Sequence, residues 1–171
     1  MAVADDVTAV LTTGGVTVNS LFASTGAAVF YDGAITVSGH APPEADVREV
    51  AAWLQAQGGA ASLFQTNNLG AAFPPWNRHA AVASGLLAVF LSDDRANMLL
   101  WFRPEEPELV TFGGSSRSKA TYDASNLPKH RYEKWTEMWH GLARPWAEWE
   151  LEMAEALRHG IADVMVRSTL R

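Results

Sequence analysis

Two segments in the first third of the chain carry apolar residues at the spacing of an amphipathic helix. The first is 2–11, with Val3, Val7, Val10 and Leu11, and the second begins at Pro43, with Val47, Val50, Ala51 and Leu54. Such positions lie on one face of a helix, so each segment predicts a helix that packs on a core. A glycine pair follows each segment and predicts its end.

Short apolar segments predict strands. The pair 27–31 and 34–38 flanks Asp32-Gly33, a dipeptide that supplies the positive φ angles of a tight hairpin turn. A further strand is predicted over 62–66. Segments 85–92 and 98–103 predict a second hairpin, joined by the polar turn 92–97. The pair Pro74-Pro75 predicts an extended or turn conformation.

The longest helical pattern lies near the C-terminus, over about 145–170. Its apolar residues recur close to the helical period and predict the packed face of one long helix: Trp146, Trp149, Met153, Leu157, Ile161 and Val164. The acidic residues are predicted to lie on its solvated face: Glu148, Glu150, Glu152 and Glu155. Core packing is also the favoured role of the tryptophans at 53, 101, 135, 139, 146 and 149.

A long arm, about 104–134, separates the last predicted strand from this helix. It begins at Pro104, which has no N–H to give to a sheet and therefore ends the strand. Loops in compact domains commonly span about 4 to 6 residues, so an excursion of about thirty residues is functional or disordered. The glycine pair Gly113-Gly114 and the cationic run Lys129-His130-Arg131 favour contact with something outside the domain.

Composition narrows the class of protein. The 171 residues, 48% of them hydrophobic and 19% charged, suit a single globular domain, 1–171. No apolar run approaches the ~20 residues of a membrane span, and no signal sequence begins the chain. We therefore expect a cytoplasmic protein without a membrane partner. A net charge of −6 with scattered cations argues against a nucleic acid partner.

No residue pattern predicts catalysis or metal binding. The chain has no cysteine, which excludes disulfides, thiolate metal sites and cysteine nucleophiles. Its five histidines lack metal-ligand spacing, and its glycine pairs lack the patterns of phosphate-binding loops. We expect no catalytic residue, no metal and no enzyme activity in this chain.

Several motifs in combination resemble the PHY domain of bacterial phytochromes. Those around the arm are Trp101-Phe102-Arg103-Pro104-Glu105, Phe112-Gly113-Gly114, the segment from Pro128 to Tyr132 with Trp135 beyond it, and Arg144-Pro145-Trp146-Ala147-Glu148-Trp149-Glu150. Others follow in the family's order and approximate spacing: Ala41-Pro42-Pro43-Glu44, Phe73-Pro74-Pro75 and Ala83-Ser84-Gly85-Leu86-Leu87. The resemblance covers nearly the whole chain.

This resemblance implies an α+β fold, in which a GAF-like antiparallel sheet is flanked by helices and carries a long tongue-like hairpin extension and a long C-terminal helix. It implies a signalling module of a bacteriophytochrome. The chain alone would bind no cofactor, because the bilin, biliverdin in the full receptor, sits in a neighbouring domain and the cysteine that attaches it lies outside the PHY domain. The implied partners are the GAF and PAS domains of the same receptor, a C-terminal output domain such as a histidine kinase, and a second copy joined through the long helices.

In the family, the tongue reaches the bilin pocket, seals it, and refolds between hairpin and helix when light isomerises the pigment. Its motif Pro-Arg-x-Ser-Phe corresponds to Pro128-Lys129-His130-Arg131-Tyr132, so the resemblance places Lys129, Arg131 and Tyr132 at the pocket. The implied tongue motif and switch residues are Trp101, Phe102, Arg103, Pro104, Glu105, Phe112, Gly113, Gly114, Pro128 and Trp135. Lysine lacks the fork of arginine, so the family's bidentate pair with a pocket aspartate is altered here.

The directions in which Lys129 and Arg131 point depend on whether their segment is a strand or a helix. In a strand, Lys129 and Arg131 project from one face, whereas in a helix they diverge by about 200°. Refolding would thus change the charge that the arm presents. A free-standing GAF-like domain that binds its own small ligand remains the alternative, and uptake of added bilin or haem by the purified chain would favour it.

Overall fold

The computed structural model describes residues 21–106 and 141–169. Within them, an antiparallel five-stranded sheet has the strand order β2-β1-β5-β4-β3. The strands are β1 (Gly26–Tyr31), β2 (Ala34–Gly39), β3 (Leu63–Thr66), β4 (Gly85–Phe90) and β5 (Met98–Arg103). The helices are α2 (Glu44–Gln57), α3 (Leu69–Ala72), the 3-10 helix η2 (Pro74–His79), α4 (Ala80–Ala83) and α7 (Glu148–Thr169). The helix predicted over 2–11 lies outside the described residues.

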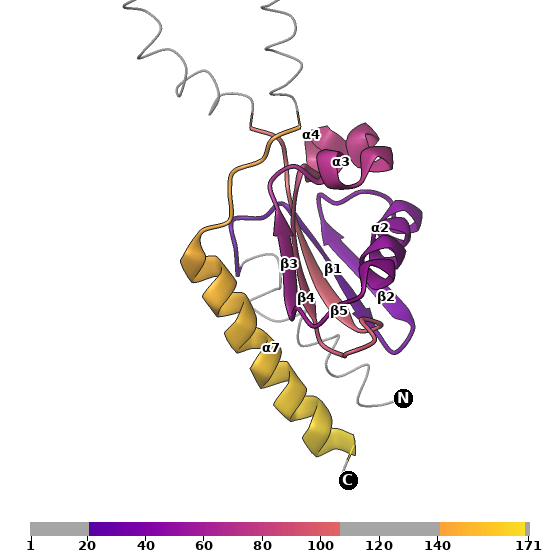
Figure 1. The fold of residues 1–171 in the computed structure, drawn as a ribbon, viewed down its shortest axis with the longest axis vertical. Helices are drawn as coiled ribbons and strands as arrows, with labels where there is room; N and C mark the ends of the chain where they lie inside the picture. The colour runs from indigo at the N-terminus through magenta and orange to yellow at the C-terminus, as the bar shows by residue number, and fades with distance from the viewer. Residues whose placement is uncertain (1–20, 107–140, 170–171) are drawn as a thin grey trace, which may run out of the picture.

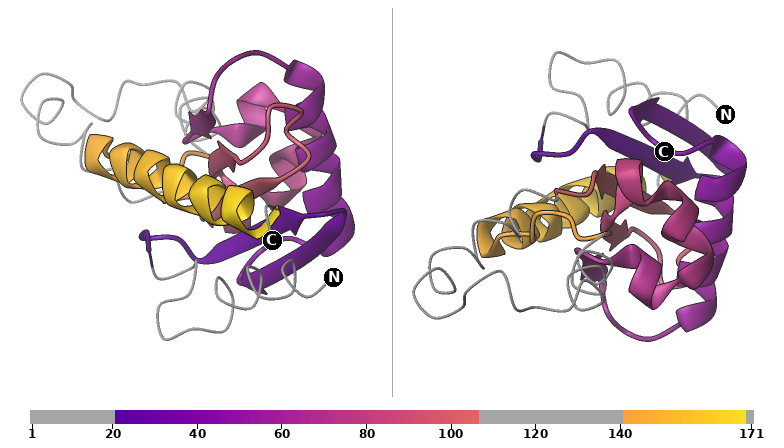
Figure 2. Two further views of the ribbon diagram at one scale, coloured as in Figure 1. Left: turned by 90° about the horizontal axis from the view of Figure 1, so that it is seen from below. Right: turned by 90° about the horizontal axis from the view of Figure 1, so that it is seen from above.

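The centre of the sheet is buried on both faces, with α2 on one side and α7 on the other (Figures 1 and 2). Every residue of the central strands β4 and β5 is buried. Leu86, Ala88 and Phe90 belong to the core beneath α2, whereas Leu87 and Val89 belong to the core beneath α7. Burial on both faces explains why these strands are apolar at successive positions.

The first hairpin and its following helix confirm the predictions. Asp32 and Gly33 have φ angles of 49° and 77° and form a two-residue turn between β1 and β2. The helix α2 begins immediately after Pro43 and is followed by Gly58, whose φ is 59°. Its buried residues are the four predicted ones, Val47, Val50, Ala51 and Leu54.

A short helical shoulder, residues 69–83, connects β3 to β4 and comprises α3, η2 and α4. Pro74 and Pro75 begin η2 here, so the predicted extended or turn conformation is wrong. Their fixed φ suits the first turn of a helix, where a missing N–H costs little. Trp76 then enters the core, donates from Nε1 to the carbonyl of Ala83 at 2.8 Å, and stacks on Phe102.

The packed face of α7 differs from the predicted one. Trp149, Met153 and Val164 are 54%, 42% and 53% exposed, whereas Ala154 and Ile161 are buried against the sheet. The partly buried residues that pack beside them are Leu151, Leu157 and Met165. The helix is therefore rotated from the expected orientation, and Trp149 is not a core residue. Among the described residues, no helix is long and apolar enough to cross a membrane.

Candidate functional site at the base of the arm

The strand β5 ends at Arg103, whose side chain is buried where the arm begins; the whole residue is 1% exposed. Its Nε donates to the carbonyl of Ala23 at 2.9 Å. Its Nη1 donates to the carbonyls of Arg144 at 3.3 Å and Pro145 at 3.0 Å. Its Nη2 donates to the carboxylate of Glu150 on α7. One side chain thus ties together segments that are far apart in the sequence.

Glu150 completes this buried ion pair and also caps the start of α7. Its second carboxylate oxygen accepts a hydrogen bond from the backbone N–H of Ala147 at 2.8 Å. A carboxylate is favourable there because the first turn of a helix carries unpaired N–H groups and partial positive charge. The guanidinium carbon of Arg103 lies 3.7 Å from the centre of the Trp146 ring, a cation–π contact. Removing one member of a buried ion pair costs about 3–5 kcal/mol, because the other charge is left uncompensated.

The two limbs of the arm are paired where they meet the sheet. The outgoing limb is 104–106 and the returning limb is 141–147, and Glu105 and Ala143 form an antiparallel bridge between them. The N–H of Glu106 donates to the carbonyl of Leu142 at 2.8 Å, and the N–H of Gly141 donates to the Glu105 carboxylate at 3.0 Å. Figure 1 shows both limbs at the end of the sheet beside α4.

The paired limbs are also fixed to the body of the domain. The N–H of Glu105 donates to the carbonyl of Ala80 in the shoulder at 3.3 Å. On the returning limb, the N–H of Ala143 donates to the carbonyl of Asn67 at 2.8 Å. Trp146 Nε1 donates to the carbonyl of Thr66 at 3.2 Å. Hydrogen bonds from both limbs therefore attach the base of the arm to the rest of the domain.

Gly85, the first residue of β4, makes room for this arrangement. A Cβ at this position would lie 2.9 Å from the Cβ of Ala143 and 3.0 Å from the Cβ of Arg103. Both neighbours are close to the backbone and belong to packed segments, so neither can yield easily. The glycine permits the returning limb to lie directly on the end of β4.

Of the predicted site residues, the structure describes five consecutive ones, from Trp101 to Glu105. Trp101 and Phe102 are fully buried in the cores on opposite faces of the sheet, and Arg103, Pro104 and Glu105 follow at the base of the arm. Arg103 and Glu105 form hydrogen bonds with the returning limb. The remaining predicted residues lie outside the described residues: Phe112, Gly113, Gly114, Pro128, Lys129, Arg131, Tyr132 and Trp135.

Glu150 is a member of the site that the sequence prediction placed wrongly on a solvated face. A capping-box pattern would have marked it, but the residue before the helix, Ala147, has no side-chain oxygen to complete that pattern. The residue that could have indicated a buried acidic partner was Arg103. An arginine at the end of an apolar strand requires a partner of opposite charge once the strand is buried.

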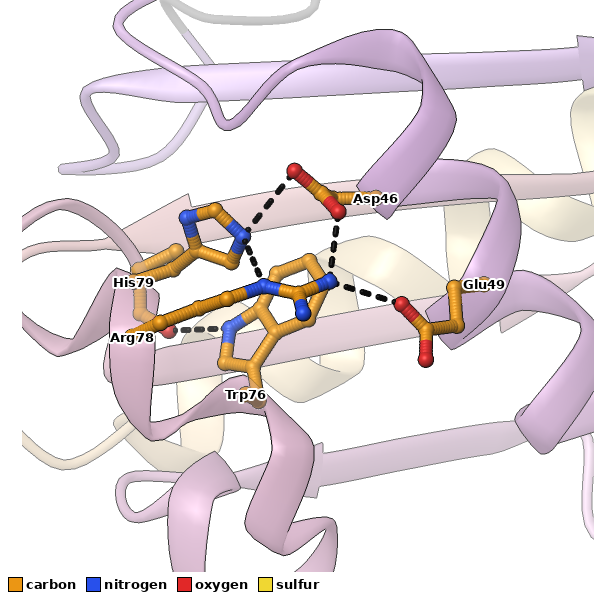
Figure 3. A network of polar contacts seen from close by, with 6 residues as sticks. Asp46, Glu49, Trp76, Arg78 and His79 are labelled. Atoms are coloured by element: carbon orange, nitrogen blue, oxygen red, sulfur yellow. Dashed lines mark hydrogen bonds and ion pairs between the residues drawn. The ribbon is translucent and has the colours of Figure 1, made fainter.

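A second polar cluster joins α2 to the shoulder (Figure 3). Arg78 Nη2 lies 2.5 Å from Asp46 Oδ1 and 2.8 Å from Glu49 Oε2, and His79 Nε2 lies 3.1 Å from Asp46 Oδ2. The side chain of Arg78 is 51% exposed, so solvent screens its ion pairs and they stabilise the fold only slightly. In the part of the chain that the structure describes, no group of three or more acidic or histidine side chains is placed to hold a metal ion.

The sequence is similar to those of phytochromes. It is 30% identical over 146 residues to cyanobacterial phytochrome B of Nostoc sp. and 31% identical over 152 residues to the phytochrome-like protein Cph1 of Synechocystis sp.. These alignments cover 83% and 86% of this chain, but only 19% and 20% of the relatives. The chain thus spans about a fifth of the length of these relatives.

A family model described as the phytochrome region, PHY, matches residues 1–169. The chain belongs to the PHY family. The fold of this PHY domain is similar to the crystal structure of the bacteriophytochrome RpBphP3 from the photosynthetic bacterium R. palustris, with a TM-score of 0.61 and 26% identity. That match covers 86% of this chain and 29% of the other. The predicted family and the predicted GAF-like α+β fold are confirmed.

Proposed function

We propose that this PHY domain is a photosensory signalling module of a bacteriophytochrome and is not itself catalytic. The family match over nearly the whole chain and the similarity to phytochromes from several organisms support this role. Biliverdin is held by a neighbouring GAF domain of the same receptor, and this chain binds no bilin alone. GAF and PAS domains precede it in the receptor.

The arm, 104–134, shields and tunes the bilin pocket of that GAF domain. Lys129, Arg131 and Tyr132 face the pocket, in the segment that corresponds to the family's tongue motif. The observation that carries the proposal is the paired base of the arm. The bridge between Glu105 and Ala143 holds both limbs at the end of the sheet, and the returning limb leads directly into α7.

The helix α7 relays the state of the arm to a C-terminal output domain, for which we propose a histidine kinase. We also propose that the receptor is a homodimer joined through its long helices. The exposed apolar residues Trp149, Met153 and Val164 support this pairing, because large apolar side chains that are left in water on one helix favour burial against a partner.

Shortening the arm in the full receptor tests the proposal. A short Gly-Ser linker replaces residues 107–140, and the bridge between Glu105 and Ala143 keeps its two ends close enough to join. The shortened receptor should still bind biliverdin, because the pocket belongs to the GAF domain. Its light-induced state should revert at least about tenfold faster in the dark, because the shield is gone; an unchanged absorption spectrum and reversion rate would contradict the proposal.

The alternative, a free-standing sensor of a small ligand, is tested on the isolated chain. We expect it to remain colourless when mixed with biliverdin, since it has no cysteine and supplies only one wall of the proposed pocket. A stoichiometric coloured complex that survives gel filtration would favour the alternative.

A further inference from the structure

We propose that Arg103 is a positioning residue that makes the base of the arm and the start of α7 a single unit, so that the two change conformation together. The inference rests on the proposed photosensory function and names the residues through which the arm acts on α7. Arg103 precedes the outgoing limb directly, bonds to the carbonyls of Arg144 and Pro145 in the returning limb, and pairs with Glu150 on α7.

The first argument is that this contact is all-or-none. The side chains of Arg103 and Glu150 are each only 2% exposed, so neither charge can exchange its partner for water by a small movement. A slip of one segment would leave a buried charge without its partner, which proteins avoid. The limbs and the first turn of α7 therefore move together, or the whole set of contacts breaks.

The second argument is that directional bonds attach the start of α7 to the arm base, whereas farther along the helix a side-chain hydrogen bond, from Ser62 to Glu155, accompanies apolar packing on the sheet. Glu150 is held by Arg103 and by the N–H of Ala147, whereas Ala154 and Ile161 contact the sheet through apolar surface. Apolar contacts are non-directional and tolerate sliding or rotation better than a hydrogen-bonded ion pair. A displacement of the limbs would thus reach α7 through Glu150.

The third argument concerns the chemistry of the contact. Replacing a buried ion pair by apolar residues of similar volume is often neutral or stabilising, so stability alone does not account for a buried Arg–Glu pair. Arg103 bonds to three backbone carbonyls as well as to the carboxylate. Because hydrogen bonds are directional, these four bonds fix the returning limb and α7 relative to β5 more closely than an apolar contact would.

Amide hydrogen exchange in this chain tests the coupling directly. Glu150→Gln keeps the size of the side chain and removes its charge. We expect exchange to accelerate about tenfold at Leu151 in the first turn of α7, and also at Glu106 and Gly141, whose N–H groups bond within the arm base and not to Glu150. Glu152→Gln, an exposed change two residues along the same helix, is the matched control and should alter neither region.

Acceleration at Leu151 alone would overturn the inference, because Glu150 would then be only a helix cap. If Glu150→Gln does not fold, Glu150→Asp provides the same test: it keeps the charge and shortens the reach to Arg103. The same joint acceleration is expected for it, and acceleration confined to α7 would again overturn the coupling.

Measurements in the full receptor separate this inference from the proposed function. Arg103→Lys keeps the charge and removes most of the hydrogen bonds; for the same fraction of photoconverted bilin, it should reduce the light-to-dark ratio of output activity at least about fivefold. Arg144→Lys, at an exposed position of the returning limb, is the control. A wild-type receptor that does not photoconvert would contradict the proposed function. Normal photoconversion together with an unchanged output ratio in Arg103→Lys would overturn only the coupling.

Discussion

At the scale of single residues, the base of the arm depends on the missing side chain of Gly85 and on the buried ion pair of Arg103 and Glu150. Gly85 has no side chain, and the returning limb occupies the space that a Cβ would need. Arg103 and Glu150, by contrast, fill the neighbouring space with a buried ion pair. The sequence identified Gly85 as the start of a strand and as part of a family motif, but not its crowding, because Ala143 is distant along the chain.

The first prediction concerns this crowding. Gly85→Ala should destabilise the domain by about 1–3 kcal/mol, because the new methyl group would overlap the Cβ atoms of Ala143 and Arg103. Urea denaturation measures the change. Gly160→Ala is the matched control: its Cβ would meet open space within α7, so it should stabilise the domain by about 0.5–1 kcal/mol. A Gly85→Ala variant as stable as the wild type would show that the limb is not seated on β4.

The second prediction concerns Glu155, which joins α7 to the residue before β3. Partial burial raises the pKa of Glu155, but hydrogen bonds from Ser62 and Arg158 outweigh this effect and leave the pKa below its ordinary value of 4.5. Because the pKa is lower in the folded state than in the unfolded state, the stabilisation is present above pH 4.5 and is lost as pH falls through the folded-state pKa.

Ser62→Ala should raise the pKa of Glu155 and weaken the pH dependence of stability below pH 4.5, which NMR titration and denaturation at several pH values measure. The effect on stability should stay below about 1 kcal/mol, because the Glu155 side chain is 33% exposed. A Glu155 pKa that does not change in Ser62→Ala would show that the hydrogen bond to Ser62 is not formed in solution.

At the scale of elements, the sequence correctly predicted those elements whose conformation depends on residues close to one another in the chain. Asp32-Gly33 predicted its hairpin, and the apolar spacing from Val47 to Leu54 predicted α2 and its buried face. The shoulder was missed because proline suits both turns and the first turn of a helix, and the burial of Trp76 in the core is not visible in the local pattern. The buried face of α7 was predicted wrongly because this helix carries apolar residues on two faces. Arg103, in a distant strand, pairs with Glu150, and the face that contains Glu150 is therefore the buried one.

The third prediction concerns the apolar residues on the exposed face of α7. Trp149, Met153 and Val164 remain exposed on α7, and we expect the chain to self-associate through them as its concentration rises. Val164→Glu should weaken association about tenfold in analytical ultracentrifugation. Val166→Glu is the matched control, since Val166 is also exposed but lies about 200° around the helix from Val164. A strict monomer at high concentration, or equal effects of both variants, would contradict this interface.

At the scale of the whole molecule, the arrangement of the layers gives the arm its position. The helices α2 and α7 occupy opposite faces of the sheet, and the limbs of the arm leave from the end of the sheet beside the shoulder (Figures 1 and 2). From the sequence, Pro104 and the length of the following segment predicted where the arm begins, and the structure describes only its base. The sequence did not predict the junction with α7, because that contact joins residues that are 47 positions apart.

The last prediction concerns the far part of the arm in the full receptor. If Lys129 and Arg131 face one acidic partner while the arm is a hairpin, removing either cation should weaken that state. Lys129→Arg should strengthen it, because arginine restores a bidentate pair, by about 1 kcal/mol or about fivefold in the equilibrium. Dark reversion measured by absorption should therefore shift in opposite directions for Lys129→Ala and Lys129→Arg.

Arg131→Ser completes this series, because it introduces the residue that the family motif carries at that position. It leaves Lys129 as the only one of the two cations on that face of a strand, so the equilibrium should become more sensitive to loss of Lys129. The double variant Lys129→Ala/Arg131→Ser should thus shift reversion more than Lys129→Ala alone. Identical resting spectra and reversion rates in all these variants would show that this part of the arm does not contact the pocket, and the proposed shielding mechanism would then be wrong even though the fold and the family stand.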